Sequence, residues 1–123
     1  MVQVTIPMRL VSEANSREHW RVVAKRKKLQ RRAVWLALHC TKQLPIPVPC
    51  TVTLCRWSPR QLDTDNLSSA FKAVRDEVAA WLGIDDRSPL VQWVYEQQPV
   101  KLLPQSVRVG DHMISITITG TPS

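Results

Sequence analysis

The sequence Asp-Thr-Asp-Asn at positions 63–66 carries the most chemically distinctive side chains of this chain. An apparent strand ends just before it and an apparent helix follows it. Alternate residues of an extended segment point the same way, so the carboxylates of Asp63 and Asp65 can aim at one spot. A second pair, Asp85 and Asp86, follows some twenty residues later. Clustered carboxylate oxygens are the ligands that Mg²⁺ requires, so the pattern predicts a metal site.

Basic residues are concentrated in a different segment. The net charge is +7, and eight of the 17 Lys and Arg residues lie between Arg17 and Arg32, whereas six of the ten acidic residues lie between Asp63 and Asp86. A basic segment beside a separate acidic focus suits a polyanion that is held and then attacked, such as a nucleic-acid backbone. A solvated helix face is the alternative. The candidate DNA contacts are Lys25, Arg26, Lys27, Lys28, Arg31 and Arg32.

A bound Mg²⁺ at the aspartates would polarise a phosphate, lower the pKa of a bound water and neutralise charge on the leaving oxygen. Lys72 is a candidate phosphate contact, because an ammonium is a compact point charge. Its alternative role is a salt bridge to Asp76 one helical turn away. Arg75 and Arg87 are weaker candidates for the same contact.

The aspartates also have a purely structural interpretation. Asp65 would be a helix cap, Asp63 a turn former, and the pair at 85–86 a solvated loop. Two like charges stacked at a strand end are unfavourable without a cation or a basic neighbour, which favours the metal interpretation. The second pair also has no nearby helix start to cap.

The chain is predicted to form one domain over residues 1–123, because this length with 44% apolar residues can bury a core of its own. It contains no apolar run of membrane-spanning length, and Met1 to Leu10 lacks the layout of a secretory signal, so we expect a cytoplasmic protein. Cys40, Cys50 and Cys55 form no Cys-x-x-Cys pair. We expect buried thiols in a reducing compartment rather than disulfides or a zinc site.

Strand patterns appear at residues 2–6, 51–57 and 90–97, and a closing hairpin is predicted from 107–109 and 113–118 with its turn at 110–111. Three prolines at positions 45, 47 and 49 mark an extended connector. The order β-α-β-α-β-β predicts an α+β fold with two layers, a mixed sheet packed against two main helices.

Residues 17–40 read as one helix, with Asn15 or Ser16 as N-cap. Arg26 falls within its predicted buried stripe, so we expect the Arg26 side chain to snorkel toward solvent. Trp20 and Trp35 flank the stripe, and we expect them in the core or in an interface. The stripe consists of Val22, Leu29, Ala33, Leu36 and Cys40.

Residues 66–82 read as a second helix, capped by Asp65 and ended by Gly83. Its predicted buried stripe consists of Leu67, Phe71, Val74, Val78 and Trp81.

At these positions the chain resembles the RusA-type Holliday junction resolvases. The residues that carry the likeness are Asp63-Thr64-Asp65-Asn66-Leu67, the Lys72 and Asp76 pair, Asp85-Asp86 before a strand, and the opening Val4-Thr5-Ile6-Pro7 with Asn15. The likeness spans roughly residues 2 to 118, of which few are specific.

The resemblance implies a small, dimeric, Mg²⁺-dependent endonuclease of phage or prophage origin that cuts four-way DNA junctions in a bacterial cell. It implies metal ligands at Asp63, Asp65 and Asp86 and an essential lysine, carried over to Lys72. The family places its lysine where this chain has Ser69, three residues earlier, a shift of ~60° and ~4.5 Å along a helix.

A straight helix over residues 66–82 would separate Asp65 from Asp86 by ~25 Å. Either the loop after the helix folds back along it, or an antiparallel two-fold dimer brings Asp65 of one subunit to Asp86 of the other. Two further functions stay open at this point: a non-catalytic nucleic-acid-binding protein on the same fold, and a module whose basic helix docks an acidic protein.

Overall fold

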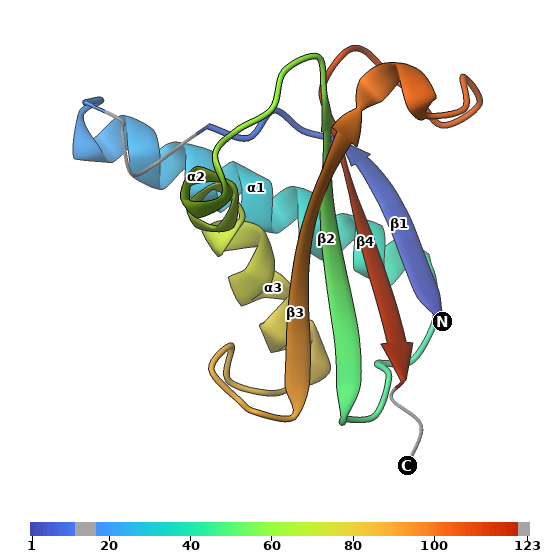
Figure 1. The fold of residues 1–123 in the computed structure, drawn as a ribbon. Coiled ribbons are helices and arrows are strands. Elements are labelled where there is room, and N and C mark those ends of the chain that lie inside the picture. Colours follow the sequence, from blue (N-terminus) through green and yellow to red (C-terminus); the bar gives the residue numbers. More distant parts are fainter. Residues whose placement is uncertain (12–16, 121–123) are drawn as a thin grey trace.

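The computed structural model describes residues 1–11 and 17–120 and packs three α-helices against one face of a four-stranded sheet (Figure 1). The predicted two-layer α+β architecture with a mixed sheet is confirmed. In chain order the elements are β1 (Val2–Pro7), α1 (Trp20–Cys40), β2 (Cys50–Ser58), α2 (Thr64–Ala70), α3 (Lys72–Leu82), β3 (Val91–Pro99), the 3-10 helix η2 (Val100–Leu102) and β4 (Met113–Gly120).

The strands lie in the order β1-β4-β2-β3. β2 and β3 are parallel, because the chain crosses over through α2 and α3 between them, and β4 is antiparallel to both β1 and β2. The predicted hairpin is wrong: residues 107–109 form no strand. β4 is a central strand with a partner on each side, so no edge is left for a hairpin neighbour.

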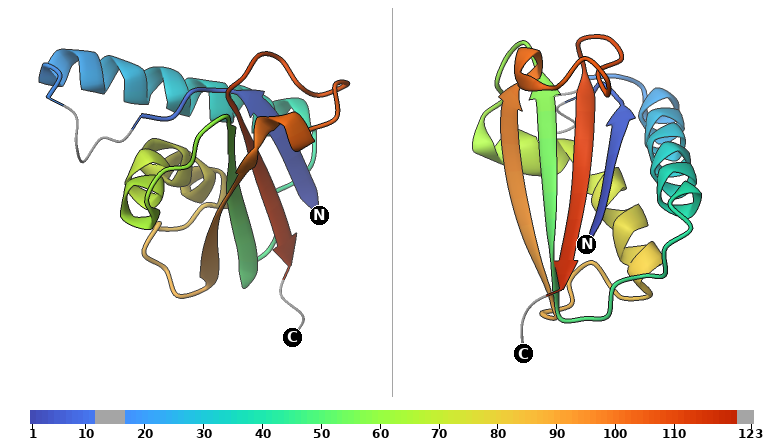
Figure 2. Two further views of the ribbon diagram at one scale, coloured as in Figure 1. Left: turned by 45° about the horizontal axis from the view of Figure 1, so that its top comes forward. Right: turned by 90° about the vertical axis from the view of Figure 1, so that its right-hand side faces the viewer.

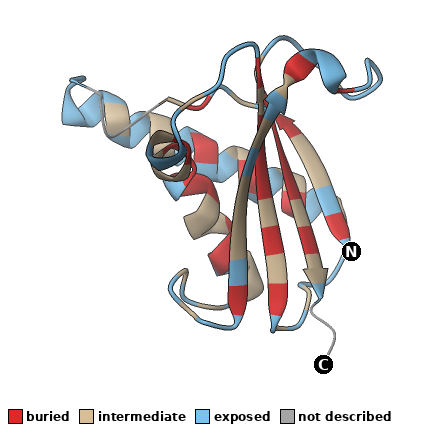
Figure 3. Ribbon diagram, viewed as in Figure 1, coloured by how far each residue is buried: buried red, intermediate tan, exposed pale blue. Residues whose placement is uncertain are grey.

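The two faces of the sheet differ sharply in polarity. Val52 and Leu54 on β2, with Ile114 and Ile116 on β4, share one face of the sheet and are fully buried. Figure 3 shows the buried segments of these strands in red. The opposite face carries polar residues such as Thr53 and, at one end, a small second apolar cluster around Met113 and Trp57. A period of two with one apolar face is typical of a sheet covered by helices on one side only.

The predicted buried stripe of α1 is wrong. The helix buries Gln30, Val34 and Leu38, whereas Leu29 and Leu36 are 58% and 45% exposed. Ala33 alone of the predicted set packs against the core, while Val22 and Cys40 are exposed. The side of α1 that faces α3 and β1 is set by tertiary packing, and the basic amino-terminal half of the helix projects beyond the sheet (Figure 2).

Other details of α1 also differ from prediction. The helix begins at Trp20, and His19 caps it by accepting a hydrogen bond from the backbone N–H of Arg21 at 3.1 Å. The predicted N-caps, Asn15 and Ser16, lie outside the described residues. Arg26 does not simply snorkel, because it forms an ion pair with Glu18. Trp20 and Trp35 are 67% and 48% exposed, so neither is a core residue.

The predicted second helix is two helices with a break at Phe71. Phe71 has φ −88° and ψ 3°, between α2 and α3, which run in clearly different directions (Figure 1). Its ring is fully buried, so core packing of this side chain coincides with the break. Gly83 ends α3 at φ 75°, as predicted. The predicted apolar stripe is confirmed, with only Trp81 partly exposed.

Cys50 and Cys55 are buried free thiols, as expected, but Cys40 is exposed at the end of α1. Burial raises the pKa of both buried thiols, and the pKa of Cys55 reaches about 11 with Glu96 adding to the effect. Among the described residues, no helix has both the length and the apolar character needed to cross a membrane.

Candidate functional site

Asp63 and Asp65 lie at the amino end of α2. Asp63, not Asp65, occupies the N-cap position, with extended backbone and its carbonyl accepting from the N–H of Leu67 at 2.8 Å. Its side chain makes no capping hydrogen bond, and Asp65 is exposed in the first turn. The carboxylates of both have no hydrogen-bond or ion-pair partner among the described residues. The predicted cap role of Asp65 is therefore wrong, while Asp63 stands at the start of the helix through its backbone.

The loop before Asp63 is fixed to the sheet by a side chain from β3. The amide of Gln97 accepts from the backbone N–H of Leu62 at 2.9 Å and donates to the carbonyl of Leu62 at 2.7 Å. Both groups are partly buried. Because both polar groups of one residue are held, the peptide immediately before Asp63 has a defined orientation.

Asp86 returns to the beginning of α3. Its Oδ2 lies 3.0 Å from Nζ of Lys72 and 3.7 Å from Nε of Arg75, and its backbone carbonyl accepts from Nη2 of Arg75 at 2.6 Å. Oδ1 of Asp85 accepts from the backbone N–H of Arg87 at 2.9 Å and has no ion pair with α3 among the described residues. Of the two aspartates, Asp86 is the one held against the helix.

Arg75 explains how the loop is held. Besides the carbonyl of Asp86, its guanidinium donates to the hydroxyl of Tyr95 at 2.9 Å and lies over the ring of Trp93 at 4.6 Å. These contacts link α3, the returning loop and β3. Arg75, a weak phosphate candidate by sequence, is here a positioning residue for Asp86.

Lys72 forms the salt bridge considered for it and a second one, whereas its contact with a phosphate stays a prediction. Its Nζ lies 2.8 Å from Oδ1 of Asp76, the expected pair one turn along, and also reaches Asp86. The hydrogen bonds to Asp76 and Asp86 raise the pKa of Lys72, and the bond from Lys72 is the main cause that lowers the pKa of Asp86. The two groups therefore stay charged over the whole physiological range.

A hollow of about 590 Å³ surrounds this pair. Ser68 and Ser69 of α2 line it together with Lys72 and Asp86, and the wall is completed by Lys27 of α1, Arg75, Arg87 and Tyr95. Asp65 lies one turn before Ser68 and Ser69 on the same helix. The hollow thus combines cationic side chains with one carboxylate, beside the helix start that carries two more.

The helix break at Phe71 and the returning loop remove the straight helix on which the ~25 Å separation of Asp65 from Asp86 was based. Among residues 1–11 and 17–120, however, no three Asp, Glu, His or Cys side chains are grouped closely enough to hold a metal ion. The donor chemistry fits Mg²⁺, with oxygen ligands only, but Asp86 faces Lys72.

The six predicted DNA contacts on α1 divide into distinct groups. Lys25, Lys28 and Arg32 are exposed, whereas Arg31 is paired with Glu77 of α3 at 3.0 Å. Arg26 is paired with Glu18, and Lys27 lines the hollow around Asp86. The basic helix and the acidic focus therefore meet at Lys27.

The sequence patterns did not predict that three residues of β3 contribute to this site: Gln97, Tyr95 and Trp93. They lie on the helix-facing side of β3, where the pattern indicates only a strand. The one available signal was polarity, because Gln97 is a polar residue on a face that is otherwise largely apolar.

In comparisons with known proteins, no family model and no curated protein matches this chain.

Proposed function

We propose that this chain is a Mg²⁺-dependent endodeoxyribonuclease that hydrolyses phosphodiester bonds in branched DNA, with four-way junctions as substrate, as in the RusA-type resolvases it resembles. The observation that supports this most directly is the return of Asp86 to Lys72. Asp86, the third predicted ligand, thereby lies against the first turn of α3, the helix that follows α2 and its aspartates.

Mg²⁺ would be held by Asp63 and Asp65, with Asp86 as the third carboxylate, and would supply a Lewis acid toward the phosphate. Lys72 keeps Asp86 ionised and is itself charged in the same hollow. Lys27 and Arg87 add cationic side chains that attract a phosphate backbone.

The displaced lysine fits the same proposal. Ser69, at the position where the resembled family has its lysine, and Lys72 line one hollow. Ser69 lies at the end of α2 and Lys72 at the start of α3, so Lys72 reaches the hollow from the far side of the break at Phe71. This supports Lys72 as the functional counterpart of the family's lysine.

A homodimer belongs to the proposal, because paired cuts in a two-fold symmetric junction need two sites related by the same symmetry. Val22, Leu29 and Leu36 are exposed on α1 at intervals of seven residues. Apolar residues at this spacing form one stripe of the kind that pairs helices. The resemblance also places the protein in the cytoplasm of a bacterial host, with a phage or prophage origin.

The decisive experiment is cleavage of a synthetic four-way junction with and without added Mg²⁺. We expect paired nicks that require the metal, and loss of nicking in Asp65→Asn while junction binding persists. A matched control is Asp111→Asn, which removes an exposed carboxylate far from this helix start. Metal-independent nicking, or an active Asp65→Asn, would refute the proposal.

A non-catalytic DNA-binding protein is the second candidate. The contact between Lys72 and Asp86 favours it, because the ammonium of Lys72 lies against the carboxylate oxygen that a metal ion would bind. If junction binding is tight and no nicking appears with either Mg²⁺ or Mn²⁺, this second function is the correct one.

A further inference from the structure

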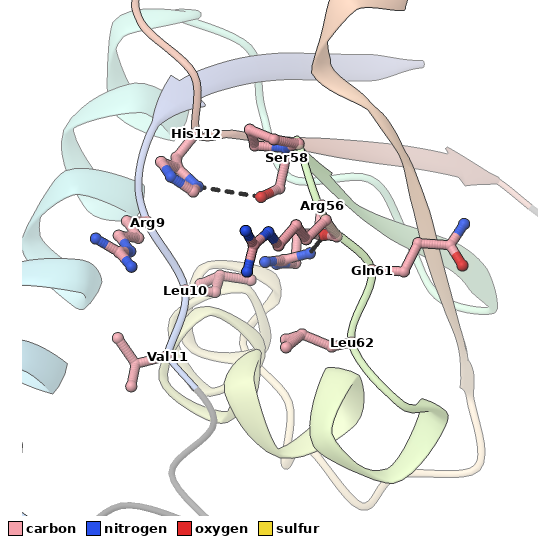
Figure 4. A pocket seen from close by; sticks show the side chains of 10 residues that line it. Arg9, Leu10, Val11, Arg56, Ser58, Gln61, Leu62 and His112 are labelled. Atoms are coloured by element: carbon pink, nitrogen blue, oxygen red, sulfur yellow. Dashed lines mark hydrogen bonds between the residues drawn. The ribbon is translucent and has the colours of Figure 1, made fainter.

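A second pocket, of about 470 Å³, lies at the carboxyl end of β2 and shares no lining residue with the hollow around Asp86. Three segments far apart in the sequence meet there (Figure 4). Its polar lining consists of Arg9 after β1, Arg56 and Ser58 on β2, Arg60 and Gln61 in the next loop, and His112 before β4.

Arg56 is the central residue of this pocket. It lies on the helix-facing side of β2, in line with the core residues Val52 and Leu54, and is only 7% exposed. A guanidinium has five N–H donors, and charged side chains are almost never this buried without a partner. Among the described residues its one hydrogen bond is from Nη1 to the backbone carbonyl of Arg60 at 2.5 Å, and the buried Nε has no partner there.

The charges around Arg56 are of the same sign. Burial, and then the positive charge of Arg9, lower the pKa of Arg56. Arg60 also lines the pocket, and within the described part of the chain no Asp or Glu pairs with any of these three arginines. Three cations around one hollow are unfavourable unless an anion joins them.

A hydroxyl and an imidazole complete the pocket. Ser58 is buried, and its Oγ lies 3.1 Å from Nδ1 of His112 (Figure 4). The backbone of His112 accepts from the N–H of Met8 at 3.1 Å, which joins the end of β1 to the start of β4. These contacts connect the ends of β1 and β2 to the residue before β4 around the pocket.

A purely structural role for Arg56 would be to hold the turn at Arg60. That role uses one donor and leaves Nε unsatisfied, and it does not require a second guanidinium nearby. A tetrahedral oxyanion accounts for more of the arrangement, because it accepts from several N–H groups and neutralises the clustered charge.

We propose that this pocket is a phosphate-binding site that seats a backbone phosphate of the nucleic acid. The choice of a polynucleotide rests on the proposed function; the phosphate chemistry does not. Leu62 lines the pocket and directly precedes Asp63, and Gln97 fixes the peptide between them. A strand seated here would be positioned relative to the aspartates by the sheet itself.

The test follows the Nε–H group of Arg56 by ¹⁵N NMR during addition of inorganic phosphate, with chloride at equal ionic strength as reference. A short oligodeoxynucleotide without divalent metal is added in a second titration. We expect the same resonance to shift in both. Arg9→Gln, an exposed position, weakens phosphate binding about tenfold, since a charged hydrogen bond is lost. Lys101→Gln removes an equal charge outside the pocket and changes the affinity for phosphate by less than about twofold.

No shift with either ligand overturns the proposal, and a shift with phosphate alone overturns the assignment to a nucleic-acid backbone. Arg56→Met is expected to abolish both responses; if it does not fold, Arg9→Gln carries the test. A shift with DNA in a protein that never nicks a junction supports the pocket and refutes the nuclease. Nicking of a junction without any shift of the Arg56 resonance supports the nuclease and refutes the phosphate-binding pocket.

Discussion

Gln97 on β3 holds the peptide of Leu62 through both of its polar groups, with hydrogen bonds of 2.9 and 2.7 Å. Within residues 1–11 and 17–120, these are the only side-chain hydrogen bonds between β3 and the loop that carries Asp63. It fixes that loop between the arginine pocket on one side and the start of α2 on the other.

Gln97→Leu should therefore reduce both stability and activity. Two partly buried hydrogen bonds at about 1 kcal/mol each predict a loss of about 2 kcal/mol in the free energy of unfolding. We expect junction nicking to fall further than DNA binding. Gln98→Leu, the next residue on the opposite face of the strand, is the control and should retain full nicking. Equal losses in the two variants would contradict the positioning role.

Lys72→Met tests the lysine at the centre of the site. Its ion pairs are exposed, so unfolding should change by less than about 1 kcal/mol. Nicking should fall by more than about tenfold if Lys72 contacts the phosphate. Thermal unfolding and single-turnover nicking measure the two effects separately, and parallel small losses would make Lys72 a surface residue.

Moving the lysine back is a sharper version of that test. In Lys72→Ser with Ser69→Lys, the ammonium projects into the same hollow from the position seen in the resembled family. We expect nicking to recover relative to Lys72→Ser alone. No recovery in a folded double variant would show that the site depends on the contact of Lys72 with Asp86.

The pair also predicts a pH dependence of stability. The pKa of Asp86 is below its ordinary value of 3.8, so its contribution is present above that pH and is lost as the pH falls through the lowered value. The pKa of Lys72 is above 10.5, so its contribution is lost only as the pH rises through the raised value. Urea unfolding should show a difference between wild type and Asp86→Asn at neutral pH that shrinks in acid. In a Lys72→Met background that pH dependence should become smaller, with Arg75 and Asp85 still lowering the pKa of Asp86.

The exposed basic face of α1 predicts how DNA affinity responds to salt. Each of Lys25, Lys28 and Arg32 that contacts a phosphate contributes about 0.9 to the slope of log affinity against log salt concentration. Replacing each with Gln should lower the slope by about that amount. Arg31→Gln should lower it less, because Glu77 already neutralises this residue. An unchanged slope in the triple variant would place the DNA elsewhere.

The exposed apolar stripe on α1 predicts self-association. Leu29→Asp inserts a charge into the middle of the stripe and should convert a dimer into a monomer in sedimentation velocity, with the fold retained. Leu44→Asp, at a more exposed leucine outside the helix, is the control. A wild-type protein that is monomeric at high concentration would rule out this interface.

Local patterns were sufficient for most of the strands and for the apolar face of the second helical region. Alternation over Cys50–Ser58 and the four-three spacing from Leu67 to Val78 are properties of neighbouring residues, which act before any tertiary contact. The aspartates were equally visible, because their type and spacing are read directly along the chain.

Where several faces of a helix are apolar, sequence does not choose among them. α1 carries apolar residues all round, and contact with α3 and β1 selects Val34 and Leu38 over Leu29 and Leu36. In the same way, β4 takes the central position of the sheet through its pairing with two distant strands, which removed the predicted hairpin.

The sequence by itself determined the layers, the basic helix and the identity of the acidic side chains, since each depends on residue type and short-range periodicity. Only the tertiary structure decided that Asp86 meets Lys72 in the same chain, that Gln97 anchors the loop of Asp63, and that Arg9 and Arg56 share a pocket. Those relationships join residues distant along the chain, and their geometry follows from how the helix breaks at Phe71 and how the strands are ordered.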